Sequence, residues 1–160
     1  MNRVALLIGG NLGDRRALLD QATVLIRQRI GTVVAVSQIY ETEPWGQFEP
    51  EEGEEGPANF LNQALLVETP LDAHAVLREA MAIEATLGRV RPQREGAYHS
   101  RTMDIDLIFF NDEVIDTPDL TIPHPRAHLR RFVLEPLAGI MPDYRHPVLG
   151  RTVKELLESL

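Results

Sequence analysis

Residues 3–9 read RVALLIG, a continuous apolar run that ends in glycine, which is typical of a central β-strand. Asp14 follows as a good helix N-cap, and apolar residues then recur at helical spacing as far as Ile30. The next segment, TVVAVSQIYET at 32–42, is rich in β-branched residues and predicts a second strand. The first 42 residues therefore predict a strand, a helix over 14–30 that ends at Gly31, and another strand.

The same order of elements recurs further along the chain. FLNQALLVET (60–69) predicts a third strand, Asp72 opens a helix that ends at Gly88, and TMDIDLIFF (102–110) predicts a fourth strand. Two βαβ halves in this order predict a ferredoxin-like βαββαβ core, an α+β fold with an antiparallel four-stranded sheet. The length of 160 residues suits a single domain over 1–160.

The remaining segments surround this core. NDEVID (111–116) predicts a hairpin turn with a short return strand, and the C-terminal extension contains helical patterns at 130–140 and 152–160. Segments 43–59 and 89–101 have no apolar periodicity and predict two long loops. Loops of this length are uncommon in a compact domain unless they carry function, so we expect both at an active site.

Composition excludes several classes of protein. There is no cysteine, which excludes disulfides, cysteine–zinc sites, iron–sulfur ligation and thiol catalysis. No apolar run approaches the roughly 18 residues of a membrane span, and the first apolar run indicates a buried strand, so we expect a cytoplasmic protein. The net charge of −8 argues against non-specific binding to nucleic acid.

Arginine dominates the cations, because Lys154 is the one lysine among sixteen positive residues. A GC-rich genome would explain the number of arginines equally well, but their positions are uneven. Residues 30–77 contain nine acids and no Lys or Arg, whereas seven of the fifteen arginines lie between 89 and 131. Arginine binds phosphate or carboxylate in two-pronged fashion, so the Arg-rich stretch indicates an anionic ligand.

Asp104 and Asp106 are the first candidates for chemistry. Residues i and i+2 of a strand share one face, about 6.5–7 Å apart, while Ile105, Leu107 and Phe109 are expected to face the core. Adjacent carboxylates favour Mg²⁺ and a phosphate-bearing substrate. An isolated D-x-D more often marks a solvated strand face, but Arg101 and the preceding Arg-rich loop favour the metal.

The loop arginines are Arg89, Arg91, Arg94 and Arg101. Mobile arginines shield the charge that develops on a phosphate during transfer. Because GGNLGD does not match a Walker A loop, the combination predicts phosphoryl or pyrophosphoryl transfer of a type without a P-loop. The alternative is a solvated loop without a ligand.

Aromatic side chains offer stacking surfaces for a flat ring. Trp45, Phe60 and Phe132 are the candidates, and the Asn62 amide is suited to recognise a ring edge, although each aromatic taken alone more often packs in a core. His124 and His128 have the i, i+4 spacing of a zinc pair. Pro125 between them and the lack of a third ligand nearby disfavour that site.

Six segments in this order resemble the family of 6-hydroxymethyl-7,8-dihydropterin pyrophosphokinases of folate biosynthesis. They are GGNLGDR near the start, YETEPWG (40–46), FLNQALLVET (60–69), E-x-x-LGR-x-R (84–91), SRTMDIDLIFF (100–110), and IPHP followed by RRFVLEPL within 122–137. The resemblance implies a ferredoxin-like fold and transfer of the β,γ-pyrophosphoryl group of ATP to the pterin hydroxymethyl group, with release of AMP.

The resemblance also implies roles for individual residues. Two Mg²⁺ ions would lie between Asp104, Asp106 and the triphosphate, while Arg89, Arg91 and Arg101 would close over the phosphates. The pterin pocket would comprise Thr42, Glu43, Trp45, Phe60, Asn62 and Phe132. The ATP side would comprise Glu84, Arg91, Leu107, Thr121, His124 and Arg130.

Two rival functions stay open from the sequence. One is a catalytically silent module that binds a pterin or nucleotide as a sensor, and the other is an ordinary kinase that moves only the γ-phosphoryl group. The acidic insert at 49–55 is expected to be mobile and to point away from ATP. The expected partners are small-molecule substrates, and a separate downstream folate enzyme is not visible in this chain, which has no room for the synthase or aldolase domain of fused relatives.

Overall fold

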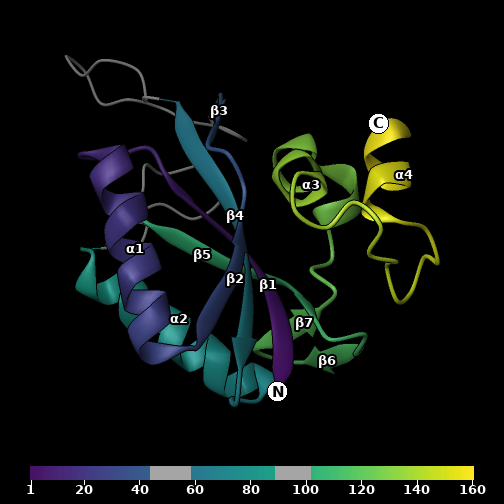
Figure 1. Ribbon diagram of the computed structural model, residues 1–160, viewed down its shortest axis with the longest axis horizontal. Helices are drawn as coiled ribbons and strands as arrows, with labels where there is room; N and C mark the ends of the chain where they lie inside the picture. The colour runs from purple at the N-terminus through teal and green to yellow at the C-terminus, as the bar shows by residue number, and fades with distance from the viewer. Residues whose placement is uncertain (44–58, 89–101) are drawn as a thin grey trace.

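The computed structural model describes residues 1–43, 59–88 and 102–160 (Figure 1). The elements follow in the order β1 (Asn2–Gly10), α1 (Arg15–Arg29), β2 (Thr32–Val36), β3 (Tyr40–Thr42), β4 (Phe60–Thr69), α2 (Ala73–Thr86), β5 (Asp104–Phe110), β6 (Ile115–Thr117), β7 (Leu120–Ile122), a 3₁₀ turn at Ala127–Leu129, α3 (Arg131–Ala138) and α4 (Val153–Glu158). No helix within these ranges is long and apolar enough to cross a membrane.

The main sheet is antiparallel, with the strand order β2-β4-β1-β5 and β3 paired to β4. The central strand β1 pairs with β4 from Asn2 to Gly10 and with β5 from Val4 to Gly9. Counting β2 and β3 as one strand, this is the order of a ferredoxin-like fold. The α+β, ferredoxin-like prediction is confirmed.

Helices cover both faces of the sheet, as Figure 1 shows, with α1 and α2 on one side and α3 and α4 on the other. Val4, Leu6 and Ile8 face the cluster that includes α1 and α2, whereas Ala5 and Leu7 face the cluster that includes α3 and α4. A strand buried on both faces needs apolar side chains at every position rather than at alternate ones. This explains why the run at 3–9 is continuous.

The first two helices begin where their caps predict. The Asp14 carboxylate accepts a hydrogen bond from the Ala17 amide at 3.2 Å, and the Asp72 carboxylate accepts one from the Ala75 amide at 2.8 Å. After α1 the chain passes very close to β4, because a Cβ on Gly31 would lie 2.0 Å from the Glu68 carbonyl oxygen. Position 31 therefore has no room for a Cβ atom, and only glycine fits.

The single strand expected at 32–42 is wrong, because it is divided into β2 and β3. Ser37 interrupts the ladder: its hydroxyl accepts the hydrogen bond from the Ala64 amide at 2.9 Å, and its carbonyl accepts one from the Gln63 side chain at 3.0 Å. Side-chain groups thus replace backbone groups at the break, a competition typical of serine.

The return strand expected within 111–116 is also wrong. β6 pairs with β7, not with β5, and forms a separate hairpin in which Ile115 lies opposite Ile122. Asn111 turns the chain away from the sheet with a positive φ of 49°, and its side chain accepts a hydrogen bond from the Arg3 amide. The sequence did not predict β7, because the strand has only three residues and is followed directly by Pro123.

A register shift in β5 overturns one expected side-chain direction. The pairing with β1 shifts between Ala5 and Leu6, so one extra residue of β5 is accommodated there. Ile105 and Leu107 face the cluster under α1 and α2 as expected, but Phe109 faces the opposite cluster. The expectation that Phe109 shares their face is wrong because strict alternation ends at the shift.

Acid is expected to destabilise the fold through two histidines. Burial, the largest cause, lowers the pKa of both His124 and His146 below the ordinary value. The unfolded chain therefore binds more protons than the folded chain once the pH falls below about 6.5, and stability declines from there towards the folded pKa values. Protonating His146 also removes the Nδ1 acceptor of the Val148 and Leu149 amides.

The measurement is the melting temperature between pH 7.5 and 5, where each kcal/mol lost lowers it by about 2–4 °C. NMR titration of the His146 ring, in the native chain and in urea, supplies the control. Equal titration midpoints in the two states would contradict the prediction.

Candidate functional site

A hollow opens on the face of the sheet that α3 covers. Its lining comes from four strands (β1, β3, β4 and β5), the residue after β3, and α3: Leu7, Ile8, Gly9, Thr42, Glu43, Phe60, Asn62, Asp104, Asp106 and Phe132. Seven of these ten residues were predicted as site residues from the sequence. Segments that are far apart in the chain therefore meet at one place.

The register of β1 explains this convergence. Gly9 lies opposite Asn62 of β4 on one side and opposite Asp104 of β5 on the other. Neighbouring strands are about 4.8 Å apart, so Asn62 and Asp104 lie about 10 Å from each other across the central strand. An amide and a carboxylate are held at the two sides of the same hollow.

Asp104 and Asp106 are both half-buried and line the hollow from one face of β5. Half-burial keeps the carboxylates in contact with solvent, so both carry their charge at lower cost than in a dry core. Among the residues that the structure describes, no group of three or more His, Asp or Glu side chains is placed to hold a metal ion. A metal bound here would take its further ligands from a substrate or from water.

Asn62 is held in place by its neighbours. Its side-chain amide donates to the Thr42 hydroxyl at 2.8 Å, and the residue is only 5% exposed. A Cβ on Gly9 would lie 2.7 Å from the Asn62 Oδ1 atom and 2.6 Å from the Leu61 carbonyl oxygen. The glycine thus leaves the space in which the Asn62 amide lies.

Two aromatic rings border the same hollow. Phe60 is 6% exposed at the start of β4, and Phe132 is half-buried in the first turn of α3. The Arg130 guanidinium lies 5.6 Å from the centre of the Phe132 ring, within the range of a cation–π contact. A flat molecule between the rings would have the Asn62 amide at its edge.

A second hollow adjoins the first, and Asp106 lines both. Its lining consists of Leu77, Ile105, Asp106, Leu107, Pro118, Asp119, Leu120, Thr121, His124 and Pro125. Three residues predicted for the ATP side, Leu107, Thr121 and His124, lie together here. Asp106 therefore lies where the two hollows meet.

His124 lines the second hollow with Asp106 and interacts electrostatically with Asp104. Burial lowers its pKa first, Arg130 and Arg126 add to the effect, and Asp104 opposes it. The ring is therefore neutral at pH 7 and can donate or accept one hydrogen bond. The zinc pair with His128 was disfavoured from the sequence, and the His128 ring lies 6.1 Å from that of His146, centre to centre.

Glu84 reaches β5 from α2. Its buried carboxylate accepts a hydrogen bond from the Ile105 amide at 2.8 Å, between the two aspartates of the strand. This contact anchors the start of β5 to α2. The role of Glu84 towards ATP stays a prediction.

Several predicted residues lie outside the described part of the chain. They are Trp45, Arg89, Arg91, Arg94, Arg101 and the acidic insert at 49–55. Conversely, sequence reasoning missed Asp119 and the β1 residues Leu7, Ile8 and Gly9. The glycine that ends the first apolar run was a usable signal for Gly9, whereas Asp119 carries no local signal.

Comparison with known proteins gives a consistent result. A family model described as 7,8-dihydro-6-hydroxymethylpterin-pyrophosphokinase (HPPK) matches residues 5–142. A 2-amino-4-hydroxy-6-hydroxymethyldihydropteridine pyrophosphokinase of Bacillus subtilis is 44% identical over 142 residues, which cover 88% of this chain and 79% of the relative. A Porphyromonas gingivalis protein of the same name is 37% identical over 145 residues, covering 90% of this chain and 93% of the relative.

Solved structures show the same fold at lower identity. The Plasmodium falciparum HPPK-DHPS wild type, crystallised with pteroate, superposes with a TM-score of 0.76 and 18% identity. The match covers 99% of this chain but 42% of the solved chain, so this chain spans about two fifths of that protein. At this identity the likeness concerns the fold alone.

Proposed function

Because the chain belongs to the 7,8-dihydro-6-hydroxymethylpterin-pyrophosphokinase family, we propose that it pyrophosphorylates 6-hydroxymethyl-7,8-dihydropterin with ATP in folate biosynthesis. The hydroxymethyl oxygen bonds to the β-phosphorus of ATP and gives up its proton to water, the bond from that phosphorus to the oxygen bridging to the α-phosphate breaks, and AMP leaves. The register of β1 carries the proposal. Asn62 and Asp104 lie opposite Gly9 on its two sides, which supports assigning the amide to the pterin edge and the carboxylate to the phosphates.

The pterin end of the site is assigned to the first hollow. Phe60 and Phe132 border the flat ring, and the Asn62 amide, oriented by Thr42, hydrogen-bonds its edge. Glu43 lines the same hollow and is assigned to the pterin. Trp45 is assigned there on the family resemblance.

Asp104 and Asp106 are proposed to hold Mg²⁺. Two half-buried carboxylates on one face offer the hard oxygen ligands that this ion prefers, and phosphate oxygens and water complete its coordination. When bound, two ions would neutralise charge on the triphosphate during transfer. The protein's own task is then to place the pterin hydroxyl in line with the β-phosphorus, with no covalent enzyme intermediate.

The ATP end of the site is assigned to the second hollow. Leu107, Thr121 and His124 line it, and the neutral His124 ring provides one hydrogen bond beside the carboxylates. Glu84 and Arg130 are assigned to the same end. On the family resemblance, Arg89, Arg91 and Arg101 close over the phosphates.

The partners we propose are therefore ATP and the reduced pterin, with a separate downstream folate enzyme as the consumer of the product. Neither nucleic acid nor membrane is proposed as a partner, given the net charge of −8. The cytoplasm is the proposed location, since the reaction consumes ATP.

The test is to incubate the protein with ATP, Mg²⁺ and the reduced hydroxymethylpterin and to identify the nucleotide product. Stoichiometric AMP with pterin pyrophosphate is the expected result. ADP would indicate an ordinary kinase and would overturn the proposed bond cleavage. Binding of both ligands without turnover would indicate a sensor instead of an enzyme.

A Thr42→Val substitution tests the orientation of Asn62. Valine keeps the shape of threonine but removes the hydroxyl that accepts from the Asn62 amide at 2.8 Å. Leaving that buried amide unpaired costs about 1–3 kcal/mol, so we expect the KM for the pterin to rise roughly tenfold with little change in kcat. An unchanged pterin KM would contradict the role, and the KM for ATP is the internal control.

A further inference from the structure

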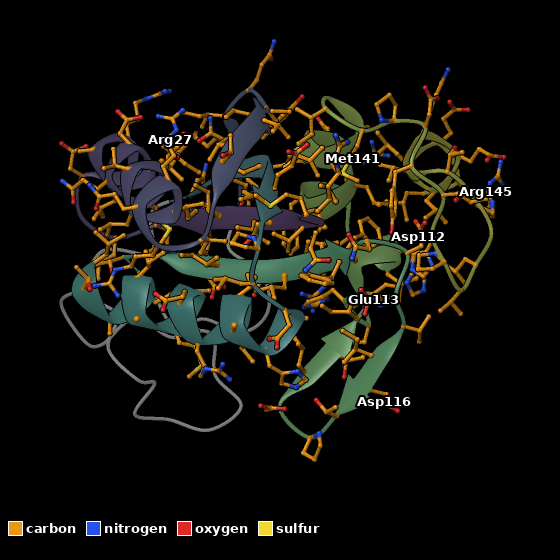
Figure 2. The ribbon with its side chains drawn as sticks, turned by 60° about the horizontal axis from the view of Figure 1, so that its bottom comes forward. Arg27, Asp112, Glu113, Asp116, Met141 and Arg145 are labelled. Carbon is orange, nitrogen blue, oxygen red and sulfur yellow. The ribbon has the colours of Figure 1, made fainter. Side chains whose placement is uncertain are left out.

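Asp119 lies in the tight turn between β6 and β7 and lines the second hollow. This hairpin lies beside α2, as Figure 2 shows, and its outer strand β6 carries the labelled Asp116. Asp106 lines the same hollow. The hollow thus has one carboxylate that we assign to metal and a second one with no assigned role.

The Asp119 side chain is held by two other elements. The Thr117 hydroxyl of β6 donates to its Oδ1 atom at 2.9 Å, and the His74 Nε2 atom of α2 lies 3.3 Å from the same oxygen. The Thr117 hydrogen bond is the largest cause that lowers the pKa of Asp119, so the carboxylate is ionised at pH 7. Both of these partners contact Oδ1.

An ionised carboxylate only accepts hydrogen bonds and repels phosphate, so Asp119 needs a neutral donor on the ligand. A nucleotide has two kinds, the ribose hydroxyls and the amino group of adenine. Leu77, Leu107 and Leu120 provide apolar surface in the hollow, which suits the flat base. The Asp119 side chain is 66% exposed, so it stands at the wet rim, where the polar sugar is better accommodated.

We propose that Asp119 recognises the ribose of ATP by accepting a hydrogen bond from its hydroxyls, and that Thr117 and His74 position its carboxylate for this. The inference rests on the proposed function, because it takes the second hollow as the nucleotide site. Acidic side chains accept from ribose hydroxyls in unrelated nucleotide-binding folds, so the chemistry is well suited.

The experiment compares ATP, 2′-deoxy-ATP and 3′-deoxy-ATP with the wild type, Asp119→Ala and Asp119→Asn. In the wild type we expect at least one deoxy nucleotide to have a KM roughly tenfold above that of ATP, as for a lost hydrogen bond to a charged group. Both variants should raise the KM for ATP by a similar factor and lose the discrimination, with kcat nearly unchanged. Asp116→Asn removes an exposed carboxylate of the same hairpin outside the hollow and should leave all three KM values unchanged.

Equal effects of the Asp119 variants on all three nucleotides would overturn ribose recognition, as would tighter ATP binding in Asp119→Asn, which would show simple repulsion of the triphosphate. If no turnover occurs, calorimetry without pterin measures the affinity for the Mg²⁺-nucleotide, and these affinities give the same comparison of the wild type with the Asp119 variants. A wild type that binds all three nucleotides but makes no AMP would disprove the proposed reaction, and the calorimetric affinities of the wild type and the Asp119 variants would still decide the role of Asp119.

His74 supplies the test of positioning. His74→Ala should raise the KM for ATP by a smaller factor, roughly threefold, because Thr117 still holds the carboxylate. In the double variant with Asp119→Ala, the His74 change should add nothing, since its effect passes through Asp119. Independent, additive effects of the two changes would overturn the positioning role.

Discussion

Asp104→Asn is expected to lower the rate of AMP formation by roughly 10³-fold or more at saturating ATP, Mg²⁺ and pterin. The substitution preserves shape but removes one of the two negative charges that we assign to the metal. Metal ions contribute several kcal/mol to such a transition state, and each 1.36 kcal/mol is a tenfold change in rate. Because Asp104 is half-buried, the change should leave the fold intact.

The measurement is initial AMP release across a Mg²⁺ titration, with the melting temperature as a check on folding. Asp112→Asn, an exposed acid in the turn after β5 labelled in Figure 2, is the control that should keep full activity. Asp106→Asn should resemble Asp104→Asn, since both carboxylates line the first hollow. Near-normal turnover of Asp104→Asn with Mg²⁺ would disprove the metal assignment.

Gly9→Ala is expected to damage stability and substrate binding together. The new Cβ would lie 2.6 Å from the Leu61 carbonyl oxygen and 2.7 Å from the Asn62 Oδ1 atom, closer than such contacts allow. The carbonyl belongs to the ladder between β1 and β4, so it cannot move unless the two strands separate. Overpacking of this kind costs typically 1–3 kcal/mol, and we expect about 2–3 kcal/mol here.

Urea unfolding measures the loss of stability. The loss of substrate binding is measured by the KM for the pterin, which we expect to rise more than roughly tenfold because the Asn62 amide is displaced. Gly139→Ala is the matched control. Its nearest contact would be 3.2 Å, to the Pro136 carbonyl oxygen, and its φ of −69° suits any residue. A Gly9→Ala protein with wild-type stability and pterin KM would show that the hollow adapts to the extra methyl group.

The sequence predicted some residues of the candidate site and not others, and the physical reason differs from residue to residue. Asp104 and Asp106 were accessible because strand periodicity alone places i and i+2 on one face. Asn62 and Phe60 had no such periodic signal; they were candidates by residue type, as a ring-edge amide and a stacking ring, and the family resemblance then assigned them to the pterin. Asp119 was missed altogether, since its relation to His74 depends on the β6–β7 hairpin lying beside α2.

Interactions between residues close together in the chain were sufficient to predict the strands and helices of the core. The apolar run at 3–9, the caps Asp14 and Asp72 and the stops Gly31 and Gly88 define strands and helices through contacts within a few residues, and these bounds agree with β1, α1 and α2. The order of those elements was enough to predict the ferredoxin-like sheet.

The features that the sequence did not predict depend on pairing between strands that are distant in the chain. The interruption at Ser37, the register shift that turns Phe109 to the other face, and the separate β6–β7 hairpin all depend on partners far away in the chain. The same is true of the site, where Asn62 and Asp104 flank Gly9. Their distance follows from hydrogen-bond register across three strands, which no local pattern encodes, because register is a property of the assembled sheet.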